Sequence, residues 1–265
     1  MDYTGPITKM ASTLSEPISY SLPIGDVSLS LDKLIGSHIR FEYSGDILCV
    51  GCGKQTKKSF AQGFCYPCFI SSPLTSECIL RPELCDAHNG KSRDMEWSRK
   101  HCLKDHIVYI ALTAGAKVGV TRLTQVPTRW IDQGAIETVV LALTPNRYLA
   151  GKIEVSLKEY ISDRTSWQKM LKNDIDSSAD IVRSRSELAS KLSDDLKEYV
   201  TSDHEYMKIL YPVLEYPSKV KSLSFDKEST IEGTLNGIKG QYLYLNENRV
   251  LNIRKHTGYV LKVLV

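Results

Sequence analysis

The sequence predicts an α+β fold in which a cysteine-rich module and a mixed core are flanked by a small antiparallel β domain. All seven cysteines fall between Cys49 and Cys102. Residues 107–174 mix β-branched runs with helical periodicity, and residues 211–265 form short alternating segments between turn residues. The expected parts are N-terminal strands in 1–48, the cysteine-rich module in 49–106, the core in 107–174, an amphipathic helix in 175–210 and a C-terminal β segment in 211–265.

The composition is that of an ordinary globular protein. The chain has 265 residues, of which 42% are hydrophobic and 25% are charged, which excludes a disordered chain and a disulfide-held miniprotein. No apolar run approaches the roughly 18 residues that a membrane span needs, and the N-terminus lacks the features of a secretory signal. We therefore expect a cytoplasmic protein with no membrane partner.

The charge is unevenly distributed along the chain. Residues 49–174 carry 18 basic and 12 acidic side chains, although the net charge of the whole chain is only +3. A basic centre indicates an anionic partner, and it also suits a merely soluble surface.

The first four cysteines form two Cys-x-x-Cys pairs, Cys49–Cys52 and Cys65–Cys68, separated by twelve residues. Thiols persist in a reducing compartment, so clustered cysteines indicate metal ligands before disulfides. Each pair can form a tight turn that offers two thiolates to one tetrahedral ion, and Gly51 and Gly53 ease the backbone there. We therefore predict a structural zinc ion.

The remaining cysteines predict a second zinc ion. Three thiolates and one imidazole make a closed tetrahedral set with no open position for catalysis. The predicted ligands are Cys78, Cys85, His88 and Cys102. His101 or His106 could replace His88, so the pairing stays open. The chain should then hold about two zinc ions.

The segment after the cysteines predicts the order β-β-α-β-α. Ile107–Leu112 and Lys117–Thr121 are strand-like runs around a short turn, which indicates a hairpin. Val126–Gly134 begins near a proline and ends at a glycine, as a short helix does. A third strand is expected at Thr138–Leu143, and Leu149–Ile161 has apolar residues at helical spacing.

This core resembles the GIY-YIG superfamily over about residues 106–172. Tyr109 in Val-Tyr-Ile, followed by Lys117-Val-Gly119, resembles the paired signature of that superfamily, with Lys117 where a second aromatic residue usually stands. The resemblance implies a nuclease-type core that contains the same order of strands and helices. The fold class is then a zinc-stapled module plus a GIY-YIG-like core, flanked by the β domain.

The resemblance also implies a catalytic set. In the superfamily an arginine on the first helix and a glutamate on a later helix contact the scissile phosphate and a divalent metal. By position, Arg129, or alternatively Arg122, resembles that arginine, and Glu154 resembles that glutamate. With Tyr109 and Lys117, these side chains could orient water, clamp a phosphate and hold one Mg²⁺ or Mn²⁺ ion. Taken one at a time, these residues also have structural explanations that involve no catalysis. For example, Glu154 and Lys158 are four residues apart and could form a solvent-exposed ion pair on a helix.

The whole chain resembles an uncharacterised bacterial family, a domain-of-unknown-function family that joins a Cys-rich zinc module to a GIY-YIG-like core. The motifs that carry this resemblance include Cys52–Phe60, Gln62–Phe69, Lys117–Arg122 and Pro127–Ala135. Thr75 and Ser92 stand where other members have cysteine. The family label implies no activity.

Lysines between the two cysteine pairs suggest a nucleic-acid contact. Cations interleaved with aromatic side chains are typical of such surfaces, and they also suit a solvated hairpin tip. The candidate contacts are Lys54, Lys57, Lys58 and Arg122, with Phe60, Phe64 and Tyr66 as neighbouring aromatic residues of the lysines.

The two ends of the chain predict one β domain with the other parts inserted between them. Segments 18–23 and 37–43 are strand-like, and Ser177–Val200 reads as an amphipathic helix. The expected C-terminal strands are Lys219–Phe225, Thr230–Leu235, Gln241–Leu245, Val250–Arg254 and Tyr259–Val265. The expected turns are Asn236-Gly237, Lys239-Gly240 and Asn246-Glu-Asn248.

Two functions follow as hypotheses. The first is a zinc-containing protein that binds RNA or DNA and cleaves phosphodiester bonds with Mg²⁺ or Mn²⁺. The second is a non-catalytic zinc-stapled adaptor or RNA-associated scaffold. The oligomeric state stays open.

Overall fold

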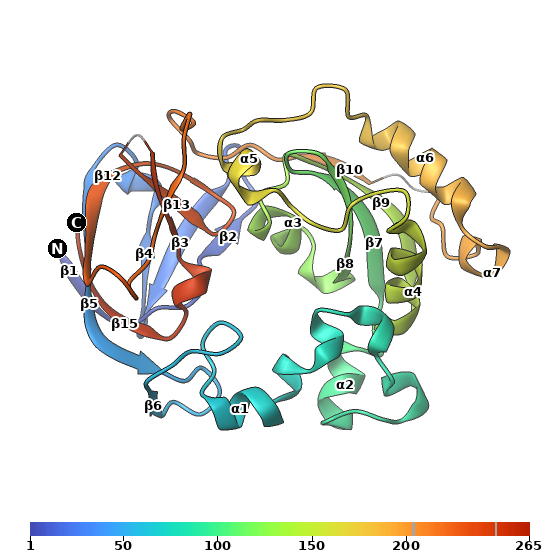
Figure 1. Cartoon of the computed structure of the whole chain (residues 1–265), viewed down its shortest axis with the longest axis horizontal. Helices are drawn as coiled ribbons and strands as arrows, with labels where there is room; N and C mark the ends of the chain where they lie inside the picture. The colour runs from blue at the N-terminus through green and yellow to red at the C-terminus, as the bar shows by residue number, and fades with distance from the viewer. Residues whose placement is uncertain (203–204, 247) are drawn as a thin grey trace. The chain divides into compact units, whose positions relative to one another are not determined.

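The computed structural model describes residues 1–202, 205–246 and 248–265. It consists of two compact units (Figure 1). Unit 1 comprises Met1–Ile70 and Leu210–Val265, and unit 2 comprises Ser71–Ile209. The cysteine-rich segment predicted as one module over 49–106 is therefore divided, with four cysteines in unit 1 and three in unit 2.

Unit 1 is built on a large sheet in the order β1-β15-β5-β12-β13-β14-β11, with β6 paired to β5. Its strands are β1 (Asp2–Pro6), β5 (His38–Leu48), β6 (Gln55–Thr56), β11 (Lys221–Leu223), β12 (Thr230–Lys239), β13 (Tyr242–Leu245), β14 (Arg249–Asn252) and β15 (Tyr259–Leu264). The first and last strands are antiparallel neighbours, from Asp2 opposite Leu264 to Pro6 opposite Val260. The two ends of the chain therefore lie side by side (Figure 1).

A second, three-stranded sheet of unit 1 has the order β2-β3-β4. Its strands are β2 (Ala11–Thr13), β3 (Ser19–Ile24) and β4 (Val27–Ser30). Alternate residues of β3 are buried, namely Tyr20, Leu22 and Ile24, as expected for a strand with one face on a core.

Two predictions for the C-terminal strands are wrong. The sheet is not wholly antiparallel, because β11 pairs with β14 in the parallel direction. Asn236-Gly237 is no turn but lies inside β12, at a bulge. Gly237 is needed there because a Cβ atom would lie 2.6 Å from the Cα atom of Val213. The turn predicted at Lys239-Gly240 lies one residue later, at Gly240-Gln241, because Lys239 still pairs with Tyr242; Gly240 has a φ of +62°.

The third predicted turn, Asn246-Glu-Asn248, includes Glu247, which lies outside the described residues. Asn246 on its near side has a left-handed φ of +54°, a conformation that asparagine tolerates better than most residues.

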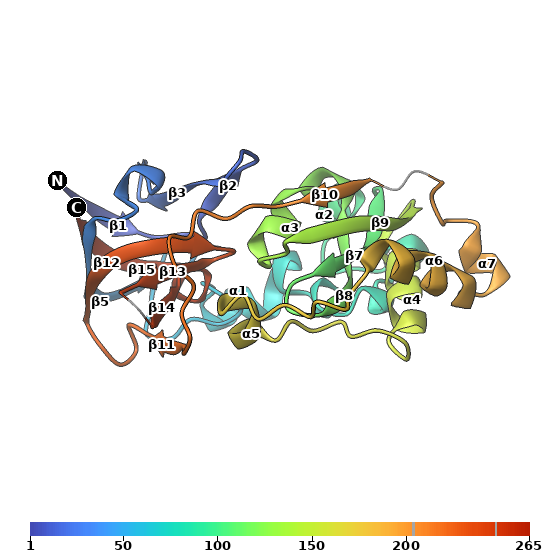
Figure 2. The same ribbon diagram turned by 90° about the horizontal axis from the view of Figure 1, so that it is seen from above.

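Unit 2 contains a four-stranded sheet in the order β10-β9-β7-β8, seen from above in Figure 2. Its main elements are β7 (His106–Leu112), β8 (Ala116–Arg122), α3 (Thr128–Asp132), β9 (Glu137–Thr144), α4 (Arg147–Leu157) and β10 (Tyr206–Lys208). The first five follow the predicted order β-β-α-β-α. Short helices precede and follow them: α1 (Tyr66–Ser71, which begins in unit 1), α2 (Met95–His101) and α5 (Trp167–Leu171).

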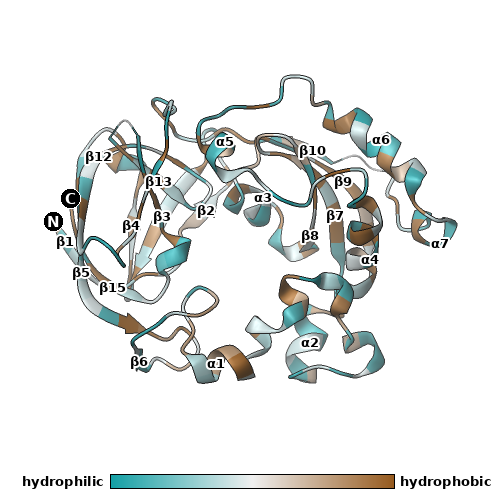
Figure 3. Ribbon diagram, in the orientation of Figure 1, coloured by the Kyte–Doolittle hydropathy of each residue, from teal (hydrophilic) through white to brown (hydrophobic). Residues whose placement is uncertain are grey.

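One face of this sheet forms the core of unit 2. Val108, Ile110 and Leu112 of β7 pack with apolar residues of α4 and of α6 (Ile181–Lys191). Figure 3 shows the hydrophobic character of β7 and the mixed character of α6. Because side chains alternate along a strand, Tyr109 and Ala111 face the opposite side. That second face carries the predicted catalytic residues of β7 and β8.

The predicted amphipathic helix Ser177–Val200 is two helices, α6 and α7 (Asp194–Lys197). Leu192 has an extended backbone, and Ser193 followed by Asp194 and Asp195 is a favourable helix start. Leu192 and Leu196 nevertheless stay buried in the core of unit 2.

Short 3-10 turns complete the structure. They are Asp32–Leu34 and Arg254–His256 in unit 1, and Pro73–Thr75, Glu77–Ile79, Pro82–Leu84, Ala87–Asn89 and Leu123–Gln125 in unit 2. Among the described residues, no helix has the length and apolar character that crossing a membrane requires.

Candidate metal centres and phosphate site

The first cysteine cluster has the geometry of a tetrahedral metal site. The Sγ atoms of Cys49, Cys52, Cys65 and Cys68 all lie within 4.8 Å of one another. The Sγ atoms of Cys52 and Cys65 are 3.8 Å apart, far beyond the length of a disulfide bond. A tetrahedral zinc ion with Zn–S distances of about 2.3 Å separates its sulfur ligands by about 3.8 Å. The donor set therefore fits zinc.

Backbone N–H groups stabilise negative charge on one sulfur of this cluster, that of Cys49. Gly51 and Cys65 donate to the Cys49 sulfur at 3.3 and 3.2 Å. Burial raises the pKa of Cys49, but these N–H groups outweigh burial and lower the pKa to about 6. A Cβ atom at position 51 would lie 3.3 Å from the Cys68 sulfur, so glycine suits the close approach.

Neighbouring sulfurs have the opposite effect on Cys68. Hydrogen bonding to Cys65 and Cys52 raises the pKa of the Cys68 thiol to about 12. Four sulfurs this close cannot all be thiolates unless a cation offsets their repulsion. A divalent metal ion would supply this positive charge.

The second cluster contains three cysteines. The Sγ atoms of Cys78, Cys85 and Cys102 lie within 4.8 Å of one another. The predicted ligand His88 is not brought into this group. His88 lies in the 3-10 turn Ala87–Asn89, and its ring stacks on Tyr148 at a centroid distance of 4.3 Å. Three thiolates still fit a zinc ion that takes a further ligand.

Helix α4 joins this cluster to the sheet of unit 2. The backbone N–H of Arg147 donates to the Cys102 carbonyl at 2.9 Å, and its Nη1 donates to the Cys78 carbonyl at 3.1 Å. Asn146 caps the helix by accepting from the N–H of Leu149. At Gly151 the helix touches the backbone of Pro82 and Glu83, where a Cβ atom would clash.

Arg122 lies near this cluster. Burial lowers the pKa of its guanidinium, and the neighbouring Arg147 acts in the same direction, while Cys102 opposes it. The structure thus places Arg122 beside Arg147 and Cys102, so Arg129 is the better candidate for the phosphate-binding arginine.

The predicted phosphate site begins with two residues on one face of the β7–β8 hairpin. Tyr109 is opposite Gly119 and Ala111 is opposite Lys117, so the side chains of Tyr109 and Lys117 project from the same face. A Cβ atom at Gly119 would lie 2.7 Å from the Tyr109 hydroxyl oxygen. The glycine of the Lys-Val-Gly motif therefore makes room for the tyrosine ring.

Helix α3 lies against this face. The ring of Trp130 contacts Tyr109 edge-on at a centroid distance of 5.9 Å. The Tyr109 hydroxyl donates to Oε1 of Gln133 at 3.3 Å. Burial raises the pKa of Tyr109, although Arg129 and Gln133 lower it, so the hydroxyl stays protonated at neutral pH.

The four predicted catalytic residues act on one another electrostatically. Burial lowers the pKa of Lys117 to about 8, Arg129 adds to this effect, and Glu154 and Asp163 oppose it. Burial also raises the pKa of Glu154; Lys158 and Lys117 oppose this effect, and Asp163 and Glu83 add to it. The charges of these residues therefore share one region of unit 2.

The Glu154 carboxylate is available for a ligand. Its side chain is half-buried, and within the described part of the chain it makes no hydrogen bond or ion pair. Lys158 acts on Glu154 electrostatically, but its ammonium forms its ion pair with Asp163 at 3.0 Å. A carboxylate with no direct ion pair among the described residues, beside further carboxylates, suits a hydrated divalent ion.

Sequence reasoning missed two polar neighbours of this site. Gln133 accepts from Tyr109 and leaves its own Nε2 buried without a hydrogen-bond partner. Glu83 leaves Oε2 buried without a partner, while its other oxygen contacts Arg81. For Gln133, its position four residues after Arg129 on a helix could have indicated that it lies near the site. For Glu83 there was no such signal, because it is distant in sequence from the other site residues.

The lysines near the first cluster are exposed and surround an aromatic group. Lys54, Lys57 and Lys58 are exposed, and the Lys58 ammonium lies 5.2 Å from the centre of the Phe60 ring. Tyr66 packs edge-on against Phe60 at 5.5 Å and is 57% exposed. Phe64 is buried, so Tyr66 is the aromatic residue that a base could reach.

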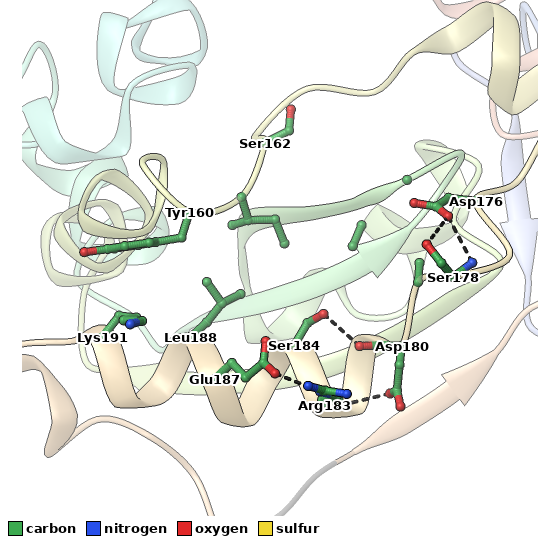
Figure 4. A pocket seen from close by; sticks show the side chains of 14 residues that line it. Tyr160, Ser162, Asp176, Ser178, Asp180, Arg183, Ser184, Glu187, Leu188 and Lys191 are labelled. Carbon is green, nitrogen blue, oxygen red and sulfur yellow. Dashed lines mark hydrogen bonds and ion pairs between the residues drawn. The ribbon is translucent and has the colours of Figure 1, made fainter.

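Unit 2 also has a cavity of about 730 Å³ beside α6, shown in Figure 4. Its charged side chains are engaged with neighbours. Arg183 contacts Glu187 at 2.8 Å, and the Lys191 ammonium lies over the Tyr160 ring at 5.7 Å. None of the predicted catalytic residues lines this cavity, so it carries no part of the phosphate site.

Comparison with known proteins gives one match. A family model described as protein of unknown function (DUF2797) matches residues 36–261. No curated protein and no solved structure matches the chain.

Proposed function

The chain belongs to the DUF2797 family, and from this premise we propose that it is a zinc-containing nucleic-acid-binding protein. Its GIY-YIG-like core would hydrolyse phosphodiester bonds of RNA or DNA with one divalent ion. The observation that carries the proposal is the mutual electrostatic influence of Tyr109, Lys117, Arg129 and Glu154, with the Glu154 carboxylate left without an ion-pair partner in the described residues.

Each side chain has a chemical role in this proposal. Glu154 would hold Mg²⁺ or Mn²⁺, which when bound stabilises negative charge on the leaving oxygen. Arg129 would bind the phosphate through its guanidinium. Lys117, with its lowered pKa, would take a proton from the attacking water, because only its neutral form has a lone pair. Tyr109 would orient that water through its protonated hydroxyl.

The rate of cleavage should therefore depend on pH through Lys117. With a pKa of about 8, neutral Lys117 increases about tenfold per pH unit below pH 8 and levels off above it. Burial is the main cause of this lowered pKa; Arg129 adds to the effect, and Glu154 and Asp163 oppose it. The measurement is the initial rate of cleavage of a labelled oligonucleotide from pH 6 to pH 9.

The variant Lys117→Arg should slow cleavage and flatten this profile, because arginine keeps its charge throughout the range. Lys152→Arg, on the exposed side of α4, is the matched control and should keep the wild-type profile. An unchanged profile in Lys117→Arg would assign the titrating group elsewhere.

Binding itself should fall steeply with salt. If Lys57 and Lys58 contact phosphates, the double variant Lys57→Glu, Lys58→Glu should lower affinity for an RNA or DNA duplex and reduce the salt slope by about two. Fluorescence anisotropy at several salt concentrations measures both quantities.

The matched control reverses two other exposed lysines of unit 1, in the double variant Lys221→Glu, Lys227→Glu. It changes the net charge equally and should alter affinity much less. Equal losses in both variants would indicate a general charge effect. Absence of binding at low salt would instead favour the non-catalytic adaptor.

A further inference from the structure

Among the described residues, the candidate metal group of unit 2 consists of three cysteine sulfurs. No histidine, aspartate or glutamate of the described residues joins Cys78, Cys85 and Cys102 within 4.8 Å. His88 stacks on Tyr148. His101 stacks on Trp97 at 4.1 Å, and its Nδ1 lies 2.8 Å from the Trp97 carbonyl oxygen.

His106 is the strongest protein alternative. Its Nδ1 lies 2.7 Å from the Lys104 carbonyl oxygen and so carries the hydrogen, which leaves a lone pair on Nε2. That Nε2 atom is buried and has no hydrogen-bond partner. Metal-binding histidines often have this arrangement, yet His106 lies outside the sulfur group.

A cavity opens directly on the three sulfurs. Its volume is about 240 Å³, and all three cysteines line it together with Asp86, Lys91, Ser92, Arg93 and Trp97. A water molecule occupies about 30 Å³ of liquid volume, so the cavity has room for more than one small molecule. A zinc ion with three protein ligands keeps its fourth position for water or another ligand.

Cationic and acidic side chains both line this cavity. Lys91 and Arg93 lie there with Glu77 and Asp86, and Lys91 is 3.6 Å from Asp86. The Arg93 Nη1 donates to the Ser72 carbonyl oxygen, and the Arg147 Nη1 donates to the Cys78 carbonyl oxygen beside the cluster. A small anion in the cavity would meet the cations Lys91 and Arg93 at its wall.

We propose that Cys78, Cys85 and Cys102 hold a zinc ion whose fourth ligand is a small exchangeable anion or water that enters from this cavity. The site is thereby a ligand-binding zinc centre, unlike the closed four-cysteine site of unit 1. This inference rests on the metal binding that the proposed function includes.

Cobalt substitution tests the proposal. Co²⁺ takes the place of Zn²⁺ in tetrahedral sites, and its visible absorption bands change when a ligand is exchanged. Azide added to the cobalt-loaded chain should shift these bands in a saturable way. The shift should persist in Cys65→Ser, which damages only the unit 1 site, and should vanish in Cys85→Ser.

Variants of two histidines decide between the fourth ligands. His106→Gln and the control His88→Ala should both retain two cobalt ions per chain and the azide response. If azide changes nothing in the wild type, and His106→Gln loses one ion, then His106 closes the site and the inference is overturned. The azide result on the wild type stands even if His106→Gln fails to fold.

A failure of this inference can be told apart from a failure of the proposed function. Two bound ions without any azide response would overturn the exchangeable ligand and leave nucleic-acid binding untouched. A single ion that is lost in Cys65→Ser would overturn the unit 2 site altogether. The salt-dependent binding experiment addresses the nucleic acid separately.

Discussion

Cys65→Ser should lower the zinc content from about two ions to about one per chain and unfold residues 49–70. This segment has little structure that could stand without the metal: β6 has two residues, and α1 has six. Phe64 is its buried aromatic residue, while Tyr66 is mostly exposed. Zinc binding supplies about 10–16 kcal/mol in small modules of this kind, and that free energy is then folding free energy.

Hydrogen exchange read by mass spectrometry measures the local effect, and elemental analysis measures the zinc. The strands β15, β5 and β12 should keep their protection, because their pairing does not depend on the cluster. Cys85→Ser is the reciprocal control: it should lose the other ion and expose residues around Cys78–Cys102 instead. Full zinc content and unchanged protection in Cys65→Ser would contradict the first metal site.

Glu154→Gln should lower the rate of Mg²⁺- or Mn²⁺-dependent cleavage by at least about a hundredfold and leave nucleic-acid affinity nearly unchanged. The amide keeps the shape of the side chain and removes its charge. A group that acts mainly in the transition state lowers turnover when it is removed, whereas a group that binds the ground state lowers affinity. Arg129→Ala should lower both, because a phosphate clamp acts in both states.

Single-turnover cleavage and equilibrium binding measure the two quantities separately. Glu159→Gln is the matched control, since Glu159 is exposed just beyond the end of α4, and it should cleave at the wild-type rate. Wild-type cleavage by Glu154→Gln would remove this residue from the mechanism. A wild-type chain that binds nucleic acid without cutting it in Mg²⁺ or Mn²⁺ would keep the binding part of the proposed function and overturn its catalytic part.

Local patterns predicted the first metal cluster and three of the four strands of the unit 2 sheet; the fourth, β10, lies in the segment 175–210 that was expected to be an amphipathic helix. Both pairs of the cluster are Cys-x-x-Cys, and each brings two sulfurs together through contacts between near neighbours. The strands of β7, β8 and β9 were predicted within one or two residues at each end, because β-branched runs and turn residues are local signals. The role of Gly119 could be recognised only in the structure. The Tyr109 ring lies across the hairpin from it and leaves no room for a Cβ atom at position 119.

The division of the cysteines depended on contacts between residues far apart in sequence. The seven cysteines are close together along the chain, yet the two clusters belong to different units. Sequence distance cannot show where one hydrophobic core ends and the next begins. For the same reason His88 was a reasonable ligand by spacing, although a stacking contact with Tyr148 holds its ring away from the sulfurs.

By itself, the sequence determined which residues could be metal ligands, where the central strands and helices lie, and that both ends of the chain are rich in strands. Only the tertiary structure decided that β1 pairs with β15, that β11 runs parallel to β14, and that Lys158 forms its ion pair with Asp163. Spacing and composition report interactions between neighbours along the chain. Which strands pair, which residues are buried and which charges surround a carboxylate depend instead on contacts between residues far apart in sequence. These contacts form only when the hydrophobic cores form.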